Sequence, residues 1–237
     1  MAEKKRFLWQ TQNPYVRARE EELLATLAME KADTVLEVGC GEGANIHNLR
    51  AWGCRTRFVG IDYSMDKVTF CRTRNLGNSQ FLCGDVLDLP FPDDLFDLIS
   101  CRDLLHHVNH DRKQAISEMI RVCKRDKKIV IIESNGSKLT LILAALLSSA
   151  EKGMIDSTPE KIRRMSKGFE DVATLEGFYM LEPSNLFRVV LHYQYGFPFL
   201  SDLRWFGKCL DFVSLAWKRV IREDRWSYIV LVLRKRT

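Results

Sequence analysis

A short apolar run that ends in glycines is the first place in the sequence where residue types and spacing indicate chemistry. The run Val35–Val38 contains Glu37 and leads into Gly39 and Gly41. Glycine at the end of a buried strand lets the backbone approach a bound molecule closely. Gly39, Gly41 and Ala44 also satisfy the G-x-G-x-x-G/A spacing of dinucleotide-binding loops. The loop alone predicts a cofactor site and leaves two classes of cofactor open.

Two further acidic residues follow the next apolar runs, and together they narrow the choice between the two classes of cofactor. Asp62 ends the run Phe58–Ile61, where its carboxylate could accept hydrogen bonds from both hydroxyls of a ribose. A dehydrogenase would place an acid there too. Asp85 ends the following run, where it could accept an adenine amino hydrogen while the Val86 amide donates to a ring nitrogen. The nicotinamide fingerprint does not require this second acid.

The glycine loop is the first of five motifs that occur in order between residues 13 and 135. They are Glu37-x-Gly39-x-Gly41, Gly60-Ile61-Asp62-Tyr63-Ser64, Gly84-Asp85-Val86 followed by Leu89-Pro90-Phe91-Pro92, Phe96-Asp97-Leu98-Ile99, and Glu118-Met119-Ile120-Arg121-Val122. Through these motifs the sequence resembles the class I S-adenosylmethionine-dependent methyltransferases, in the branch with the type 11 small-molecule enzymes. One departure is Lys124–Lys128, which replaces the family's Lys-Pro-Gly-Gly turn.

The resemblance implies S-adenosylmethionine as the cofactor and assigns residues to its parts. Gly39 and Gly41 would form the floor under the methionine part, and Glu37 would help to orient its ammonium group. Asp62 would hold the ribose. Each residue also has a structural alternative that the sequence leaves open: the glycines could only permit a tight turn, and Asp62 could cap a helix.

Five more residues are predicted to bind the cofactor. Asp85 and Val86 would read the adenine, although Asp85 could also be an ordinary turn residue. Tyr63 would lie against the base or simply pack, and Tyr15 would close over the cofactor from an N-terminal cap. The backbone around Ser100 to Arg102, which includes Cys101, would complete the pocket for the amino-acid part. No metal site is predicted.

Candidate catalytic residues follow the fourth predicted strand and end the fifth. Methyl transfer is an in-line displacement at an already activated sulfonium carbon, so a protein mainly aligns the nucleophile and excludes water. A base is needed only when the acceptor carries a proton of high pKa. His106 and His107 could supply that base, or form a cap or a structural hydrogen-bond relay. Glu133 could face the acceptor or tie down a lid.

The elements that must position these residues alternate along the chain, which predicts a parallel sheet. The expected fold is α/β and Rossmann-like: a seven-stranded, mostly parallel sheet with helices on both faces and a lid insertion between strands five and six. Strands are expected at Thr34–Val38, Arg57–Ile61, Gln80–Cys83, Leu98–Ser100, Ile129–Glu133, Phe187–Gln194 and Trp226–Leu233. Helices are expected at Ala44–Arg50, at Met65–Arg74, and near Leu139–Ser148 and Thr158–Ser166. Ser64 is expected to cap the second of these helices, and Asp111 is expected to cap a further helix that follows it.

One domain is expected to contain all 237 residues. Its predicted parts are an N-terminal cap (1–30), a cofactor-binding core (31–135), the lid insertion (136–182), and the final strands with a basic C-terminal segment (183–237). The N-terminus is charged and no apolar run is long enough to span a bilayer, which predicts a cytoplasmic protein. Seven scattered cysteines without a C-x-x-C pair predict free thiols.

The formal net charge of +5 is unevenly distributed along the chain. From Trp205 onward there are eight Lys or Arg residues and three Asp or Glu residues, so the remainder of the chain is neutral. This distribution argues against a broad nucleic-acid-binding surface. The C-terminal segment, with Trp205, Trp217 and Trp226, could instead contact a membrane surface or a lipid-like substrate, or it could pack on the core.

Taken together, the motifs predict an enzyme that transfers a methyl group to a small molecule, lipid-like or natural-product in character. Three alternatives stay open. The chain could methylate a protein side chain, or act as a nicotinamide-dependent oxidoreductase. It could also be a non-catalytic, cofactor-binding partner subunit. Fold-level resemblance does not choose the acceptor atom.

Overall fold

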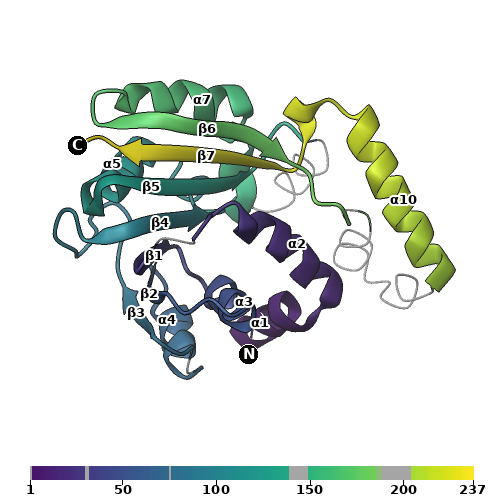
Figure 1. Ribbon diagram of the computed structural model, residues 1–237, viewed down its shortest axis with the longest axis horizontal. Helices are drawn as coiled ribbons and strands as arrows, with labels where there is room; N and C mark the ends of the chain where they lie inside the picture. The colour runs from purple at the N-terminus through teal and green to yellow at the C-terminus, as the bar shows by residue number, and fades with distance from the viewer. Residues whose placement is uncertain (1, 30–31, 75, 139–148, 186, 188–203) are drawn as a thin grey trace.

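A seven-stranded sheet forms the centre of the computed structural model, which describes all residues except 1, 30–31, 75, 139–148, 186 and 188–203 (Figure 1). The strand order is β3-β2-β1-β4-β5-β7-β6, and β7 runs antiparallel to both of its neighbours. The strands are β1 (Thr34–Val38), β2 (Arg57–Asp62), β3 (Ser79–Cys83), β4 (Phe96–Arg102), β5 (Cys123–Ser134), β6 (Ala173–Leu181) and β7 (Tyr228–Lys235). The predicted Rossmann-like, mostly parallel architecture is confirmed.

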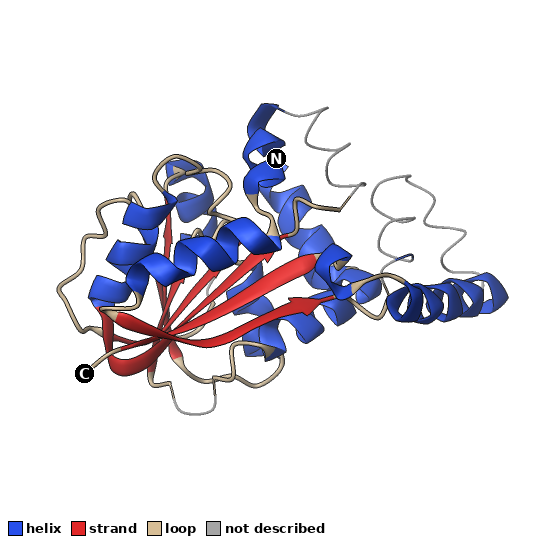
Figure 2. Ribbon diagram, turned by 90° about the horizontal axis from the view of Figure 1, so that it is seen from above, coloured by secondary structure: helices blue, strands red, loops and turns tan. Residues whose placement is uncertain are grey.

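Helices cover both faces of this sheet (Figure 2). The α-helices are α1 (Ala2–Gln12), α2 (Pro14–Ala25), α3 (Ala44–Ala51), α4 (Met65–Arg72), α5 (Arg112–Val122), α7 (Pro159–Ser166) and α10 (Arg204–Val220). Ser64 caps α4 as predicted, because its hydroxyl accepts a hydrogen bond from the Lys67 amide at 3.5 Å. Asp111 occupies the N-cap position of α5, but its side chain makes no capping hydrogen bond. That part of the prediction is wrong.

Two apolar layers hold the helices to the sheet because successive strand side chains point to opposite faces. On one face, Leu36 and Ile131 pack in a cluster with Ile116 and Met119 of α5. On the other face, a second cluster joins the strands to α2, α3 and α4; its members include Val35, Phe58, Val130, Leu23, Leu24, Ile46 and Val68. Strands buried on both faces explain the near-continuous apolar runs in the sequence.

The carboxyl ends of the central strands lie together at one edge of the sheet. Val38 is in register with Ile61 of β2 and with Cys101 of β4, and Cys101 is in register with Ile131 of β5. The strand order reverses between β1 and β4, which is where ligands bind in open α/β sheets. The candidate residues that follow these strands are thereby brought to a common edge.

The sixth strand lies elsewhere than predicted. It is formed by Ala173–Leu181, inside the stretch 136–182 that was expected to be the lid, and the connection between β5 and β6 is 135–172. The pairing of β6 with β7 shifts register between Leu175 and Gly177, which hides the regular alternation of a strand. Most of the predicted strand Phe187–Gln194 lies outside the described residues.

Other predictions near this connection have mixed outcomes. The predicted helix Leu139–Ser148 lies outside the described residues. Thr158–Ser166 is confirmed as α7, with the Thr158 hydroxyl accepting a hydrogen bond from the Lys161 amide at 3.3 Å. The last strand, predicted at Trp226–Leu233, is β7 and begins at Tyr228.

Candidate functional site

The loop between β1 and α3 depends on glycine backbone geometry. Gly39, Gly41 and Gly43 have φ angles of 72°, 54° and 74°, in the left-handed region that side chains disfavour. A Cβ atom at Gly41 would meet nothing within 4 Å, so this part of the loop faces open space. A Cβ atom at Gly39 would lie 3.2 Å from the Leu104 side chain. The loop can therefore present bare backbone to a ligand.

Asp62, at the end of β2, is bound directly to this loop. Its Oδ2 accepts a hydrogen bond from the Gly41 amide at 2.8 Å, and its Oδ1 accepts one from the Ser64 amide at 2.9 Å. Each carboxylate oxygen has a second lone pair for a further donor. The side chain is thus held in place while it can still accept two hydroxyl hydrogens.

Glu37 of β1 is a buried acid with one unsatisfied oxygen. Its Oε1 accepts a hydrogen bond from Asn45 Nδ2 at 2.6 Å, whereas Oε2 is buried without a hydrogen-bond partner. Burial raises the pKa of Glu37 to about 7, although the Asn45 hydrogen bond and Arg102 act to lower it. An unsatisfied buried oxygen is costly unless a ligand supplies its donor. Glu37 therefore fits a site for a cationic, hydrogen-donating group.

Arg102, the last residue of β4, lies beside Glu37. The sequence predicted a role for the backbone there but none for the Arg102 side chain. Its guanidinium pairs with both carboxylate oxygens of Glu20 from α2, and its Nη1 lies 3.4 Å from Asn45 Oδ1. Burial alone would raise the pKa of Glu20, but Arg102 and Arg19 lower it to about 2. The one sequence signal for this pair is an acid on an N-terminal helix. Helical periodicity does not show whether that acid is buried or exposed to solvent.

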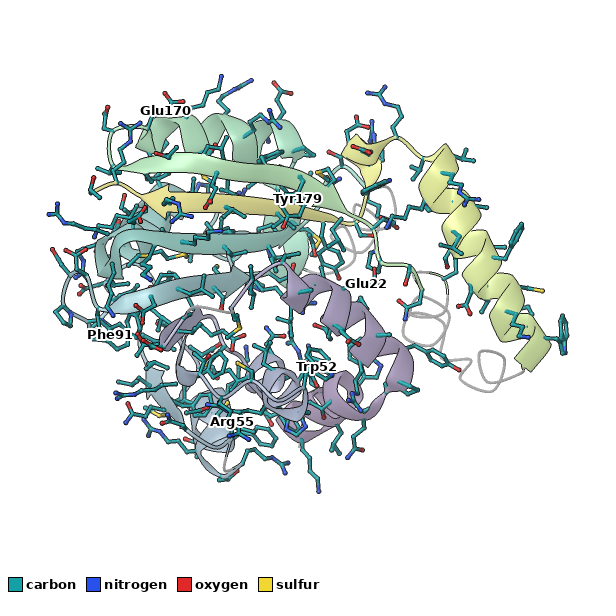
Figure 3. The ribbon with its side chains drawn as sticks, in the orientation of Figure 1. Glu22, Trp52, Arg55, Phe91, Glu170 and Tyr179 are labelled. Atoms are coloured by element: carbon teal, nitrogen blue, oxygen red, sulfur yellow. The ribbon has the colours of Figure 1, made fainter. Side chains whose placement is uncertain are left out.

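The N-terminal helices close this edge of the sheet. Ser184, which follows β6, donates hydrogen bonds to Glu22 of α2, and Figure 3 shows Glu22 on the side of α2 toward that segment. Asn185 Nδ2 donates to the Tyr15 carbonyl at 2.6 Å. The space left beside Glu37 is about 10 Å³, roughly the room that one water needs. Leu24 of α2 and Asn45 of α3 are among the residues that line this space.

The residues predicted to contact an adenine follow β2 and β3. Tyr63 is 81% exposed, so its ring lies open to solvent. Asp85 is exposed as well, and its Oδ1 accepts a hydrogen bond from the Leu87 amide at 2.9 Å. Val86 is buried and packs with the core. Their roles toward a cofactor stay predictions.

Two other predicted contacts lie deeper in the structure. Tyr15 is half-buried in the first turn of α2, below the Asn13 cap. Cys101 is buried in β4, and burial raises the pKa of its thiol well above the ordinary value, with Glu133 adding to the effect. A protonated, enclosed thiol is a packing group rather than a nucleophile.

Glu133, at the end of β5, anchors the loop that follows β4. Its Oε1 accepts hydrogen bonds from the Leu104 and Leu105 amides at 2.8 and 2.6 Å. Its Oε2 lies 2.9 Å from His106 Nδ1 and 3.5 Å from the Ser157 hydroxyl. A carboxylate only accepts, so His106 donates from Nδ1 and keeps Nε2 as its basic nitrogen.

The two predicted histidines differ in their surroundings. His106 is buried and His107 is exposed, although their ring centroids are 4.1 Å apart. Ligand atoms of Asp103, His106 and Glu133 lie within 4.8 Å of one another, close enough to share a cation. However, Asp103 Oδ1 already accepts from the Ser134 amide and hydroxyl. Both oxygens of Glu133 also accept hydrogen bonds. These carboxylate oxygens, which could otherwise ligate a cation, are therefore used in hydrogen bonds within the protein.

The fold and this edge together define a class of protein: an α/β domain with a glycine-rich cofactor loop after its first strand and an acid at the end of its second. Residues 36–131 match a family model described as a methyltransferase domain, of type 11. Residues 36–131 therefore carry a methyltransferase domain of the type 11 family.

Individual relatives agree with this assignment. A fatty-acid O-methyltransferase of Mycolicibacterium smegmatis is 42% identical over 66 residues, 27% of this chain and 24% of that protein. A demethylmenaquinone methyltransferase of Staphylococcus epidermidis is 32% identical over 122 residues, 50% of each. The plantazolicin methyltransferase BamL, solved with a desmethylPZN analog and SAH, aligns with a TM-score of 0.63 at 14% identity, covering 100% of this chain and 90% of that chain. The chain spans about half or less of the length of the curated relatives it matches.

Proposed function

We propose that this chain is a methyltransferase that transfers the methyl group of S-adenosylmethionine to a small-molecule acceptor. The observation that carries the proposal is the buried, unsatisfied Oε2 of Glu37 beside a glycine loop that is tied to Asp62. A cationic group above the loop would satisfy Glu37, and a diol would satisfy the remaining lone pairs of Asp62.

The residues at the carboxyl ends of the central strands match the chemical groups of S-adenosylmethionine. Glu37 would hold the ammonium of the methionine part, the backbone of Gly39 and Gly41 would lie beneath it, and Asp62 would bind the ribose. Arg102 would neutralise the methionine carboxylate, a role that it now fills for the carboxylate of Glu20. Binding would then exchange an internal ion pair for one with the ligand.

The bound cofactor would supply a methyl group that its positive sulfur has already activated. What the chain must add is alignment of the acceptor with that methyl group and exclusion of water, which can lower the barrier by several kcal/mol. The packed N-terminal helices over this edge would exclude water once closed. The hydrogen bonds from Ser184 to Glu22 of α2 would hold that closure after Arg102 has left Glu20.

His106 would accept a proton from an acceptor that carries one of high pKa. Its Nδ1–H is held by Glu133, so Nε2 is the nitrogen that could take the proton. Glu133 is a positioning residue in this proposal, because its oxygens are engaged with the loop and with His106. His107 is exposed and would serve, if at all, at the entrance.

A small apolar acceptor is supported by the relatives. The similar proteins include a fatty-acid O-methyltransferase and a demethylmenaquinone methyltransferase, whose names indicate small acceptors. The neutral charge of the chain before residue 205 does not favour a nucleic acid. We propose the same class of acceptor here and leave a protein side chain as the alternative.

Calorimetric titration with S-adenosylmethionine tests the proposal. Asp62→Ala removes the group assigned to the ribose and is expected to weaken binding at least about 100-fold, as for loss of charge-assisted hydrogen bonds. Asp66→Ala removes an acid from the first turn of the next helix, α4, and should leave affinity unchanged. Wild-type affinity in Asp62→Ala would contradict the assignment.

A thermal-shift comparison separates the cofactor classes. A ligand that binds only the folded chain raises its apparent stability, and the rise grows with the logarithm of the ligand concentration above its Kd. S-adenosylmethionine is expected to raise the unfolding temperature, and NAD at the same concentration is not. The reverse result would favour an oxidoreductase.

A further inference from the structure

Helix α10 turns its apolar side outward. Trp205, Phe212, Val213 and Val220 are 67%, 71%, 45% and 84% exposed. Two small residues are the fully buried ones among the described residues of α10: Gly207 is buried and Ser214 is 2% exposed, whereas Phe206 and Leu210 are half-buried. A helix that belonged to the core would bury its large apolar residues instead.

Helical geometry places these two sets on opposite sides. At 100° per residue, Trp205, Val213 and Val220 fall within a common arc, whereas Ser214 lies on the far side. The buried side is held by hydrogen bonds, since the Ser214 hydroxyl donates to the Leu210 carbonyl and accepts from the Phe187 amide at 3.1 Å. The Phe187 amide therefore contacts α10 on the side opposite the apolar arc.

The position of α10 leaves this side accessible. Figures 1 and 2 both show α10 at the end of the molecule, projecting beyond the sheet and its covering helices. Its 17 residues extend for about 25 Å. No helix among the described residues is long and apolar enough to cross a bilayer. A surface contact along the helix is compatible with this length.

Basic residues border the apolar side. Lys208 and Arg219 are exposed and follow one edge of the apolar arc. Asp211, which is the acid in the α10 sequence, lies on the opposite side of the helix from Val220. Between Arg204 and Val220 there are four Lys or Arg residues and one acid, which gives α10 a net charge of +3. A partner for this surface must accept aromatic side chains and also supply negative charge.

We propose that α10 lies lengthwise on an anionic lipid surface. Trp205, Phe212 and Val213 would enter the boundary between headgroups and acyl chains, and Lys208 and Arg219 would contact lipid phosphates. Amphipathic helices with aromatic residues on one face and Lys or Arg at its border bind membranes in this way. A second copy of the chain would bring another positive surface rather than the negative charge that the basic border requires.

Co-sedimentation of the full chain with lipid vesicles tests the apolar contact. Vesicles containing about 30 mol% phosphatidylglycerol are expected to bind at least tenfold more tightly than pure phosphatidylcholine vesicles. Val213→Asp should weaken this binding by more than about tenfold. Val172→Asp makes the same change at a valine that is 50% exposed, against 45% for Val213, and should bind as the wild type does.

Charge reversal tests the basic border. Lys208→Glu with Arg219→Glu is expected to weaken binding to the anionic vesicles by about 30-fold, and added salt should reduce wild-type binding. Lys161→Glu with Arg164→Glu makes the same change on exposed residues of α7 and should have little effect. Thermal unfolding of each variant shows whether it still folds.

Three outcomes would overturn the proposal. The wild type could fail to bind anionic vesicles, or Val213→Asp could bind them as tightly as the wild type. Alternatively, sedimentation equilibrium without lipid could show a wild-type dimer that Val213→Asp converts to monomers, so that a second copy covers α10. None of these readouts involves methyl transfer, so the proposed activity is tested separately.

Discussion

Two buried glutamates at the same edge of the sheet differ in how their oxygens are used. Glu37, from β1, has one oxygen bound to Asn45 and one with no partner. Glu133, from β5, accepts hydrogen bonds from two amides and from His106. The fold leaves one oxygen of Glu37 without a hydrogen-bond partner, whereas it supplies partners for both oxygens of Glu133.

This difference separates a ligand-binding acid from a positioning acid. Buried carboxylate oxygens normally have hydrogen-bond partners in the folded protein. A buried oxygen without a partner is tolerated where a ligand supplies the missing hydrogen bond. The region around Glu37 is therefore the part of the edge that we propose binds the cofactor. The region around Glu133 holds the loop after β4, including His106, in a fixed geometry.

The largest expected effect is the loss of stability on Glu133→Ala. The substitution leaves the Leu104 and Leu105 amides buried without acceptors and releases His106. We expect the free energy of unfolding to fall by about 4 kcal/mol, measured by urea denaturation. Glu133→Gln keeps an acceptor oxygen and should lose less. A change below about 1 kcal/mol would show that Glu133 is not a structural anchor.

A smaller effect concerns the pH dependence of stability at Glu37. Because burial raises its pKa to about 7 from 4.5, the folded chain keeps a proton in this range that the unfolded chain has released. Stability without cofactor should therefore fall as the pH rises through this range, by roughly 3 kcal/mol from this residue. Glu37→Gln stays neutral and should remove that contribution, as urea denaturation at a series of pH values would show. An unchanged slope in Glu37→Gln would contradict the description of Glu37.

The smallest effect on stability is expected for Gly41→Ala. The new Cβ meets no atom within 4 Å, so the cost is the left-handed backbone alone, about 1 kcal/mol. The methyl group would nevertheless occupy the surface on which the cofactor is proposed to lie. Cofactor affinity should thus fall much more than stability. Equal affinity in Gly41→Ala and the wild type would place the ligand away from the loop.

The strand ends and the glycine loop on the proposed cofactor side could be located from the sequence because their signals are local. Gly39, Gly41 and Asp62 each follow an apolar run directly, and a parallel sheet necessarily brings strand ends together. The ion pair between Arg102 and Glu20 joins residues 82 positions apart, so no local pattern reports it. The hydrogen bonds that Glu133 accepts likewise come from backbone amides of another loop, so no local pattern predicts them.

The later part of the chain was predicted less well. β6 carries a register shift at Gly177 and lies at the sheet's edge, so its residues lack the alternation that marks a half-buried strand. The tryptophans and basic residues of the C-terminal segment were visible in the sequence, but residue types do not reveal whether a helix turns its apolar residues to a core or to solvent. The contact between Ser214 and Phe187 joins segments that no local pattern relates.

Titration of the wild type and Glu37→Gln with S-adenosylmethionine tests the central claim most directly. If the ammonium binds ionised Glu37, with its pKa of about 7 in the free chain, wild-type affinity should rise about tenfold between about pH 5.5 and 7. Glu37→Gln should bind more weakly and without this pH dependence. Wild-type affinity that is equal at the two pH values, or retained in Glu37→Gln, would contradict the account.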